Sequence, residues 1–189
     1  MIARTTHDSS TLGPRQAAAC LGNLMGKRAT AGTTIEGKYR LERELGAGGM
    51  GAVWLATQLM VDRPVAIKLL HPAFVDQEDL QARFEVEAKA IGRLNHPNVI
   101  TLYDFGHSEE LRAFYTVIEF IDGVSLDKRL NQRIPLYEVV AIIRQVALAL
   151  AHAHHHSILH RDLKPETVML ARMTDGTEMV KVLDFGIAR

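Results

Sequence analysis

The sequence has one cysteine, no excess of charge of either sign and no long apolar run. The single Cys20 excludes a disulfide within the chain and suits a reducing compartment, so we expect a cytoplasmic protein. Its 22 basic and 22 acidic residues balance, which argues against a broad nucleic-acid-binding surface. No apolar stretch reaches the roughly 18 residues of a transmembrane helix. The N-terminus also lacks the basic start and apolar core of a secretory signal.

Length and composition fit one globular domain preceded by a leader. Of the 189 residues, 47% are hydrophobic and 23% are charged, which is ordinary for a soluble domain with its own core. Residues 1–37 are rich in Ala, Gly, Thr and Ser, lack a sustained period and contain the breaker Gly13-Pro14. We predict a disordered leader over 1–37, interrupted by a short helix around Gln16–Met25, and an ordered domain over 38–189.

Residues 38–121 have the pattern of a sheet with one helix. Tyr39–Leu45 alternates apolar and polar residues, as a half-buried strand does. Asp79–Leu94 places apolar residues at three- and four-residue spacing, which is typical of an amphipathic helix; the following Asn95-His96-Pro97 ends it. The sequence therefore predicts a five-stranded antiparallel sheet and one helix. The other four strands are predicted at Ala52–Ala56, Val65–Leu70, Val99–Phe105 and Phe114–Phe120.

Residues 122–189 have the pattern of the beginning of a mainly helical part. Ser125–Asn131 is predicted as a short helix, and Pro135–His156 carries a wide apolar stripe that predicts a long one. Val168–Ala171 and Met179–Leu183 read as a hairpin whose turn contains Asp175-Gly176, a favoured turn dipeptide. The predicted fold class is α+β.

Three glycines after the first predicted strand form a phosphate-binding pattern. Gly46-x-Gly48-x-x-Gly51 fits the dinucleotide-binding fingerprint, which requires a helix to begin at the third glycine. The β-rich Val53-Trp54-Leu55 follows instead. This favours a strand–loop–strand hairpin whose glycines let backbone N–H groups approach a phosphate. A plain hairpin turn with flexible glycines stays open as the alternative.

Charged residues stand at three places where apolar strands end. Lys68 lies near the end of Val65–Leu70, where a charge is costly unless it is paired. Glu87 on the predicted helix is the favoured partner, because it leaves the apolar residues on the buried side, and Glu85 is the alternative. The other two places are His160-Arg161-Asp162-Leu163-Lys164-Pro165-Glu166 and Asp184-Phe185-Gly186.

In this order, the glycine loop, Val65-Ala66-Ile67-Lys68 and these two segments resemble the signature set of the protein kinases. Lys164-Pro165-Glu166 looks like the serine/threonine-specific type, and the glycine loop resembles bacterial members of eukaryotic type. The resemblance implies a protein-kinase-like fold, with a first lobe over about 38–121 and a second, incomplete lobe over about 122–189. It also implies phosphoryl transfer from ATP, with Mg²⁺, to a serine or threonine hydroxyl of a protein substrate.

The resemblance also implies residue roles. Asp162 would orient the attacking hydroxyl, Lys164 would neutralise charge on the transferred group, and Asp184 would bind Mg²⁺. Lys68, oriented by Glu87, would hold the phosphates. Ile118 would be the gatekeeper, and Ile91, Leu102, His160 and Phe185 would stack across the lobes. The remaining implied ATP-binding residues are Leu45, Gly46, Ala47, Gly48, Gly49, Met50, Gly51, Ala52, Val53, Ala66, Glu119, Ile121 and Met169.

Two features depart from this pattern or stand outside it. The family has Asn five residues after the catalytic Asp, as a ligand of a second Mg²⁺, whereas this chain has Thr167. A threonine hydroxyl can bind Mg²⁺ but is shorter, so Thr167 is a candidate ligand only. His152 and His154–His156 crowd the end of the long helix, where they suit the negative end of the helix dipole. Metal binding by His152 and His156 is the alternative.

We therefore carry two hypotheses, an ATP-dependent serine/threonine kinase and a truncated, non-catalytic nucleotide-binding or interaction module of pseudokinase type. A complete kinase continues beyond Asp184-Phe185-Gly186 with further helices. We expect several apolar side chains of the long helix to stay partly exposed, among Val139, Ile142, Ile143, Val146 and Leu150. A partner that covers this surface is a further expectation, whereas no nucleic-acid partner is expected.

Overall fold

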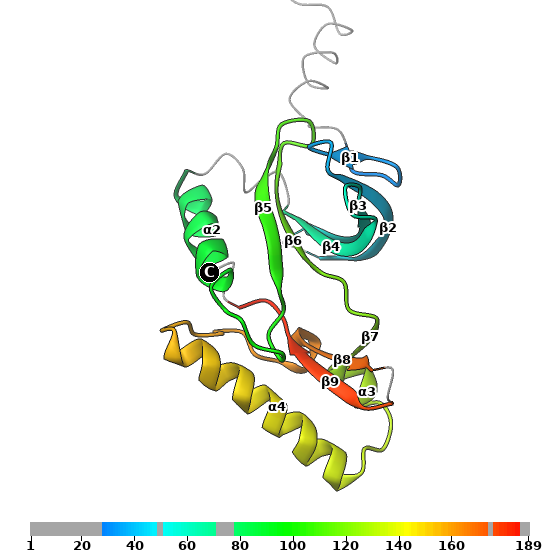
Figure 1. The fold of residues 1–189 in the computed structure, drawn as a ribbon, viewed down its shortest axis with the longest axis vertical. Helices are drawn as coiled ribbons and strands as arrows, with labels where there is room; N and C mark the ends of the chain where they lie inside the picture. Colours follow the sequence, from blue (N-terminus) through cyan, green and yellow to red (C-terminus); the bar gives the residue numbers. More distant parts are fainter. Residues whose placement is uncertain (1–27, 49–50, 71–77, 174–175, 186–189) are drawn as a thin grey trace, which may run out of the picture.

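The computed structural model describes residues 28–48, 51–70, 78–173 and 176–185. They form a sheet lobe, residues 28–121, and a helical lobe, residues 122–185, which lie one above the other in Figure 1. The α+β fold class is therefore as predicted. The predicted helix at Gln16–Met25 lies outside the described residues.

The sheet lobe is built on one antiparallel sheet of six strands in the order β1-β2-β3-β4-β6-β5. Two register shifts in β2 mark bulges, between Leu41 and Arg43 and between Glu44 and Gly46, and bulges of this kind increase the local twist. Figure 1 shows the resulting strong curl of β2, β3 and β4. The strands are β1 (Thr34–Ile35), β2 (Tyr39–Gly48), β3 (Gly51–Gln58), β4 (Arg63–Leu70), β5 (Leu102–Ser108) and β6 (Ala113–Glu119).

Two predictions about this sheet are wrong. It has six strands and not five, because Thr34 and Ile35 pair with Arg40 and Tyr39. The Ile35 side chain is fully buried in the core of the sheet, so the ordered part begins inside the predicted 1–37 leader. The fourth predicted strand is displaced as well, since β5 begins at Leu102, whereas Val99 makes only an isolated bridge.

One helix, α2 (Glu78–Ile91), accompanies the sheet and lies beside β5 (Figure 1). It ends at Ile91, three residues before the predicted end at Leu94. Gly92 follows directly, and its N–H still donates to Ala88 O at 2.9 Å. The N–H of Leu94 then donates to Ile91 O in a turn. Ile91 itself is buried with residues of the helical lobe.

The helical lobe contains a three-stranded antiparallel sheet of order β7-β8-β9 and two helices. The predicted hairpin is confirmed, with a third strand, β7, added from the segment that enters the lobe. The long helix is confirmed within one residue at each end. The elements are β7 (Gly123–Ser125), α3 (Leu126–Arg129), α4 (Leu136–His155), the 3₁₀ turn η2 (Pro165–Thr167), β8 (Val168–Arg172) and β9 (Glu178–Val182).

The helix α4 packs on β9 with one narrow face and leaves the rest of its surface open. Ala149 and Ala153 are fully buried and Ile142 nearly so, so the expectation of partial exposure is wrong for Ile142. It is confirmed for Val139, Ile143, Val146 and Leu150, which are half-buried or exposed. Length and mean hydropathy alone would let α4 cross a membrane, but its contacts with β9 identify it as a helix of this lobe.

The two lobes are joined through the segment before β5. Ile100 N donates to Val182 O and Val182 N donates to Asn98 O, which gives a parallel bridge between Val99 and Val182. The side chain of Asn98 adds a bond to Val180 O. This junction holds β9, and the residues that follow it, against the sheet lobe.

Candidate active site

A pocket of about 360 Å³ opens where the two lobes meet. Val53, Ala66 and Ile118 line it from the sheet lobe, and Met169 and Leu183 line it from the helical lobe. The structure thus gathers around one space part of the predicted ATP-binding set, contributed by β2, β3, β4, β6, the segment after β6, and β8. The predicted residues that line the pocket are Leu45, Val53, Ala66, Ile118, Glu119, Ile121 and Met169.

The glycine loop is the hairpin that joins β2 to β3, next to this pocket. Gly48 pairs with Gly51, and Gly46 and Ala47 pair with Val53 and Ala52. The strand–loop–strand interpretation is therefore correct, and no helix begins at Gly51. The two residues between the paired glycines, Gly49 and Met50, lie outside the described residues.

Gly51 occupies a position that only glycine fits. Its φ is +141°, and a Cβ atom built on it would lie 1.9 Å from the carbonyl oxygen of Leu69 on the neighbouring strand. The absence of a side chain thus lets β3 and β4 come together at the base of the loop. By contrast, a Cβ atom on Gly46 or Gly48 would meet nothing within 4 Å.

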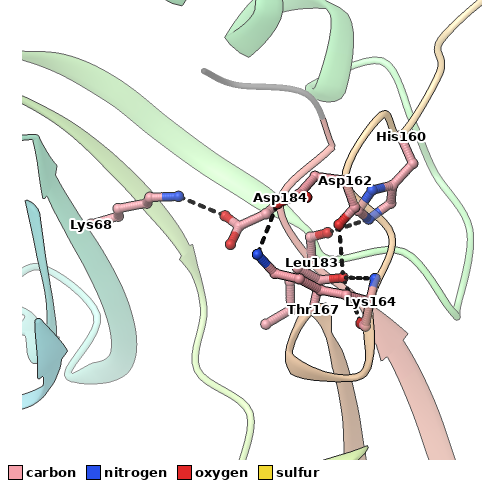
Figure 2. Close-up of polar contacts among 7 residues, drawn as sticks. All are labelled: Lys68, His160, Asp162, Lys164, Thr167, Leu183 and Asp184. Atoms are coloured by element: carbon pink, nitrogen blue, oxygen red, sulfur yellow. Dashed lines mark hydrogen bonds and ion pairs between the residues drawn. The ribbon is translucent and has the colours of Figure 1, made fainter. Parts of the chain in front are cut away.

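Lys68 reaches across the lobes to Asp184. Its Nζ lies 2.8 Å from Asp184 Oδ1, and the Lys68 side chain is only 18% exposed. Figure 2 shows the two side chains pointing toward each other from β4 and from the segment after β9. The side chain of Glu87 lies outside the described residues, so the predicted Lys68–Glu87 pair stays a prediction. Glu85, the alternative partner, pairs with Lys89.

The segment between α4 and η2 places two charged side chains beside Asp184. Lys164 Nζ donates to Asp162 Oδ2 at 2.9 Å (Figure 2). This hydrogen bond raises the pKa of Lys164 above its ordinary value of 10.5, so the amine is charged at neutral pH. Arg161 and Asp184 have φ angles of +63° and +51°, a strained region that non-glycine residues seldom adopt and that is concentrated at functional sites.

The buried Thr167 side chain stabilises this segment through hydrogen bonds to its backbone. Its Oγ1 accepts the N–H of Lys164 at 3.1 Å, and it donates to Lys164 O at 2.9 Å. The hydroxyl is thus engaged with backbone atoms of the loop that carries Asp162 and Lys164. Its role as a metal ligand stays a prediction.

His160 connects the same segment to the strand that leads to Asp184. Its buried ring packs against Phe185 with a centroid distance of 4.8 Å, and Phe185 belongs to a buried cluster that includes Ile91 and is flanked by Leu102. His160 Nε2 lies 2.8 Å from Leu183 O. Because a carbonyl can only accept, Nε2 carries the proton, and the neutral ring suffices for this bond.

We predict that the folded chain loses stability as the pH falls from about 7.5 to about 5.5. Burial lowers the pKa of His160, and burial together with the neighbouring His156, His96 and His155 lowers the pKa of His152. The unfolded chain therefore binds more protons below pH 6.5, so unfolding becomes easier there. Urea unfolding at both pH values measures the loss. His152→Gln should reduce it, and stability that is unchanged or higher at pH 5.5 would contradict the prediction.

The rings of His96, His152 and His156 form a row at the end of α4. The rings of His96 and His152 lie 5.2 Å apart, and those of His152 and His156 lie 4.6 Å apart. Within the described part of the chain, no group of three or more His, Cys, Asp or Glu side chains is arranged to hold a metal ion. His156 Nδ1 bonds to His152 O at the helix end, which supports the helix-end interpretation over the metal site.

Sequence reasoning missed one charged pair at the pocket. Lys181 of β9 lies 2.7 Å from Glu119, at the end of β6. The signal was a lysine within the apolar run Met179–Leu183, where a charge needs a partner. Ile100 and Leu183 were missed as lining residues as well, because no local pattern distinguishes them from plain core.

The chain is similar throughout this region to known proteins. Residues 39–189 match the protein kinase domain. Serine/threonine-protein kinase pkn3 of Myxococcus xanthus is 46% identical over 160 residues, which cover 84% of this chain and 29% of that protein. Serine/threonine-protein kinase PrkC of Bacillus subtilis is 37% identical over 167 residues, 87% of this chain and 24% of that protein.

A solved structure with the same arrangement is the PknI kinase domain of Mycobacterium tuberculosis, with a TM-score of 0.72 at 31% identity. The likeness covers 86% of this chain and 64% of that one. This chain therefore spans less than a third of the length of these two named relatives and under two thirds of the solved domain.

Proposed function

The chain belongs to the protein kinase family, and from that premise we propose that it binds Mg-ATP for phosphoryl transfer to a serine or threonine hydroxyl of a protein. The observation that carries the proposal is the contact between Lys68 and Asp184. These residues are 116 positions apart in sequence, yet they meet at 2.8 Å next to the pocket. Val53 is the register partner of Lys68, and Leu183 precedes Asp184; both line the pocket.

The pocket suits an adenine ring. Its walls are mainly aliphatic, with Val53 and Ala66 contributed by the sheet lobe and Met169 by the helical lobe. Flat rings gain from burial between apolar side chains, while a few polar backbone groups fix their orientation. The segment 119–121 borders the pocket, and its backbone would supply those groups.

The charged residues next to the pocket suit the phosphates and their metal. Lys68 would bind phosphate oxygens through its ammonium group, and Asp184 would bind Mg²⁺ through its carboxylate. Mg²⁺ held there would offset the negative charge of the phosphates. The 2.8 Å pair keeps both groups side by side, because each neutralises the other.

Asp162 and Lys164 would act at the transferred group. Asp162 would accept a hydrogen bond from the substrate hydroxyl and orient it, and Lys164 would place its positive charge on the transferring phosphoryl. Their mutual contact at 2.9 Å keeps them within reach of one reacting centre. We further propose a cytoplasmic location, where Cys20 would stay reduced.

The second candidate function is nucleotide binding without transfer. It is favoured by Thr167, whose hydroxyl is engaged by the backbone of Lys164 at the position where the family carries a metal-binding Asn. Incorporation of labelled phosphate into a generic basic protein distinguishes the two candidates. Transfer supports the kinase, and binding without transfer supports the module.

We expect Lys68→Met to weaken Mg-ATP binding by about tenfold to a hundredfold, since a hydrogen bond to a charged group contributes roughly 1.5–3 kcal/mol. Calorimetric titration of folded wild-type and variant chains measures the change. Lys89→Met is the matched control, because Lys89 forms an exposed pair with Glu85 on α2 and should leave affinity unchanged. Equal affinities for the wild type and Lys68→Met would remove Lys68 from this role.

A further inference from the structure

The carboxylate of Glu119 ties three segments of the chain together. Its Oε1 accepts a hydrogen bond from Lys181 Nζ at 2.7 Å and a second from Thr101 N at 2.8 Å. The backbone N–H of Glu119 donates to Thr101 O at 3.0 Å. The end of β6, the segment that precedes β5, and β9 therefore converge on this one residue.

Both side chains of this ion pair are largely buried. Lys181 and Glu119 are 13% and 19% exposed, whereas Asp184 in the pair with Lys68 is 46% exposed and Glu138 in the pair with Arg129 is 27% exposed. Burying two charges has a large desolvation cost, so such a pair is weak evidence for stability. The segments that the pair connects are therefore more informative about its role than its contribution to stability.

The pair joins the end of β6 to β9 beside the pocket. Glu119 lines the pocket itself, together with its neighbours Ile118 and Phe120. Lys181 is the register partner of Met169, another lining residue. Two residues beyond Lys181, the chain reaches Leu183 and then Asp184. A change in the separation of Glu119 and Lys181 would therefore change both the width of the pocket and the position of Asp184.

We propose that Glu119 and Lys181 are positioning residues for nucleotide binding, which hold the end of β6 and β9 at the separation that the pocket requires. The inference depends on the proposed function, because it concerns the same pocket. It assigns to Lys181 a role that no motif assigns, and it assigns to Glu119 a side-chain role in addition to the backbone role expected of this segment.

The test compares Mg-ATP affinity among matched variants of the 189-residue chain. We expect Lys181→Met to raise Kd about tenfold and Lys181→Arg, which keeps the charge, to stay within about threefold of the wild type. Arg129→Met is the control. Arg129 and Glu138 also form a 2.7 Å pair with 18% and 27% exposure, but neither lines the pocket. This control should lower the urea midpoint and leave Kd unchanged.

A double-mutant cycle supplies the second measurement. If the two residues act as a pair, Glu119→Gln combined with Lys181→Met should raise Kd no more than the larger single change. Kd unchanged in Lys181→Met, or raised equally in Arg129→Met, would overturn the inference while leaving the proposed function intact. Absence of Mg-ATP binding by the folded wild-type chain would overturn the proposed function, and the inference with it.

Discussion

Gly51→Ala should destabilise the sheet lobe by about 3 kcal/mol or more, a large share of the ~5–15 kcal/mol that stabilises a typical domain. Two effects combine. The φ of +141° is strained for any residue with a Cβ atom, and the new atom would lie 1.9 Å from Leu69 O. That oxygen belongs to the backbone of β4, so relief requires β3 and β4 to separate where Gly51 pairs with Leu70. Urea unfolding followed by circular dichroism measures the loss.

The matched control is Gly46→Ala in the same hairpin. A Cβ atom at Gly46 would meet nothing within 4 Å, and its φ is outside the left-handed region. We expect a change within about 0.5 kcal/mol, as for an ordinary exposed substitution. If the two alanine variants lost the same stability, glycine would matter here for flexibility alone and the close approach to Leu69 would be irrelevant.

The second large effect concerns the open face of α4. Leu136, Tyr137, Val140 and Ile143 are between 58% and 78% exposed, and Ile143 borders an apolar hollow of about 420 Å³. An apolar patch of this kind, on a chain with zero net charge, favours association. We expect the wild-type chain to self-associate and Val140→Lys/Ile143→Lys to be monomeric. Size-exclusion chromatography with light scattering measures the masses.

The control for the Val140→Lys/Ile143→Lys variant separates the loss of apolar surface from the gain of charge. Asn131→Lys/Gln132→Lys adds the same two charges at exposed positions just before α4, so it should associate like the wild type. A monomeric wild type, or an equal rescue by the control, would show that the open face of α4 does not drive association.

Much of the fold could be predicted because local patterns and tertiary contacts agree. The apolar stripe of α4 and the turn residues of the β8–β9 hairpin predict elements that the structure confirms within one residue. The family membership, implied by four motifs in the right order, is confirmed as well. These signals are strong because the helix has a regular apolar period and the hairpin has a dipeptide that favours a tight turn.

The wrong predictions of strands in the sheet lobe also have physical causes. The strand β1 has only two residues, which is too short for an alternating pattern, and its order comes from burial of Ile35 against the sheet. β5 starts at Leu102 and not at Val99, because the backbone of the preceding residues is hydrogen-bonded to Val182. Such a contact between residues far apart in sequence leaves no trace in a local window.

For the site, the sequence predicts which residues gather and leaves open how they pair. Lys68 needed a charged partner, but the motif alone could not say that Asp184 would be within 2.8 Å. The pair of Glu119 and Lys181 joins two strands of different lobes. Thr167 was recognised by its departure from the family pattern, whereas its hydrogen bonds to Lys164 depend on the shape of the loop.

The parallel bridge between Val99 and Val182 has a consequence for the order of folding. All strands of the six-stranded sheet precede residue 120, and four of its five strand pairings join strands that are adjacent in sequence. Contacts of this local kind form quickly, whereas closing a long loop is slow. The glycine hairpin and Lys68 should therefore be in place before β9 attaches. The arrival of β9 brings Asp184 to Lys68, so this pair should form only in a long-range step that follows the folding of the sheet lobe.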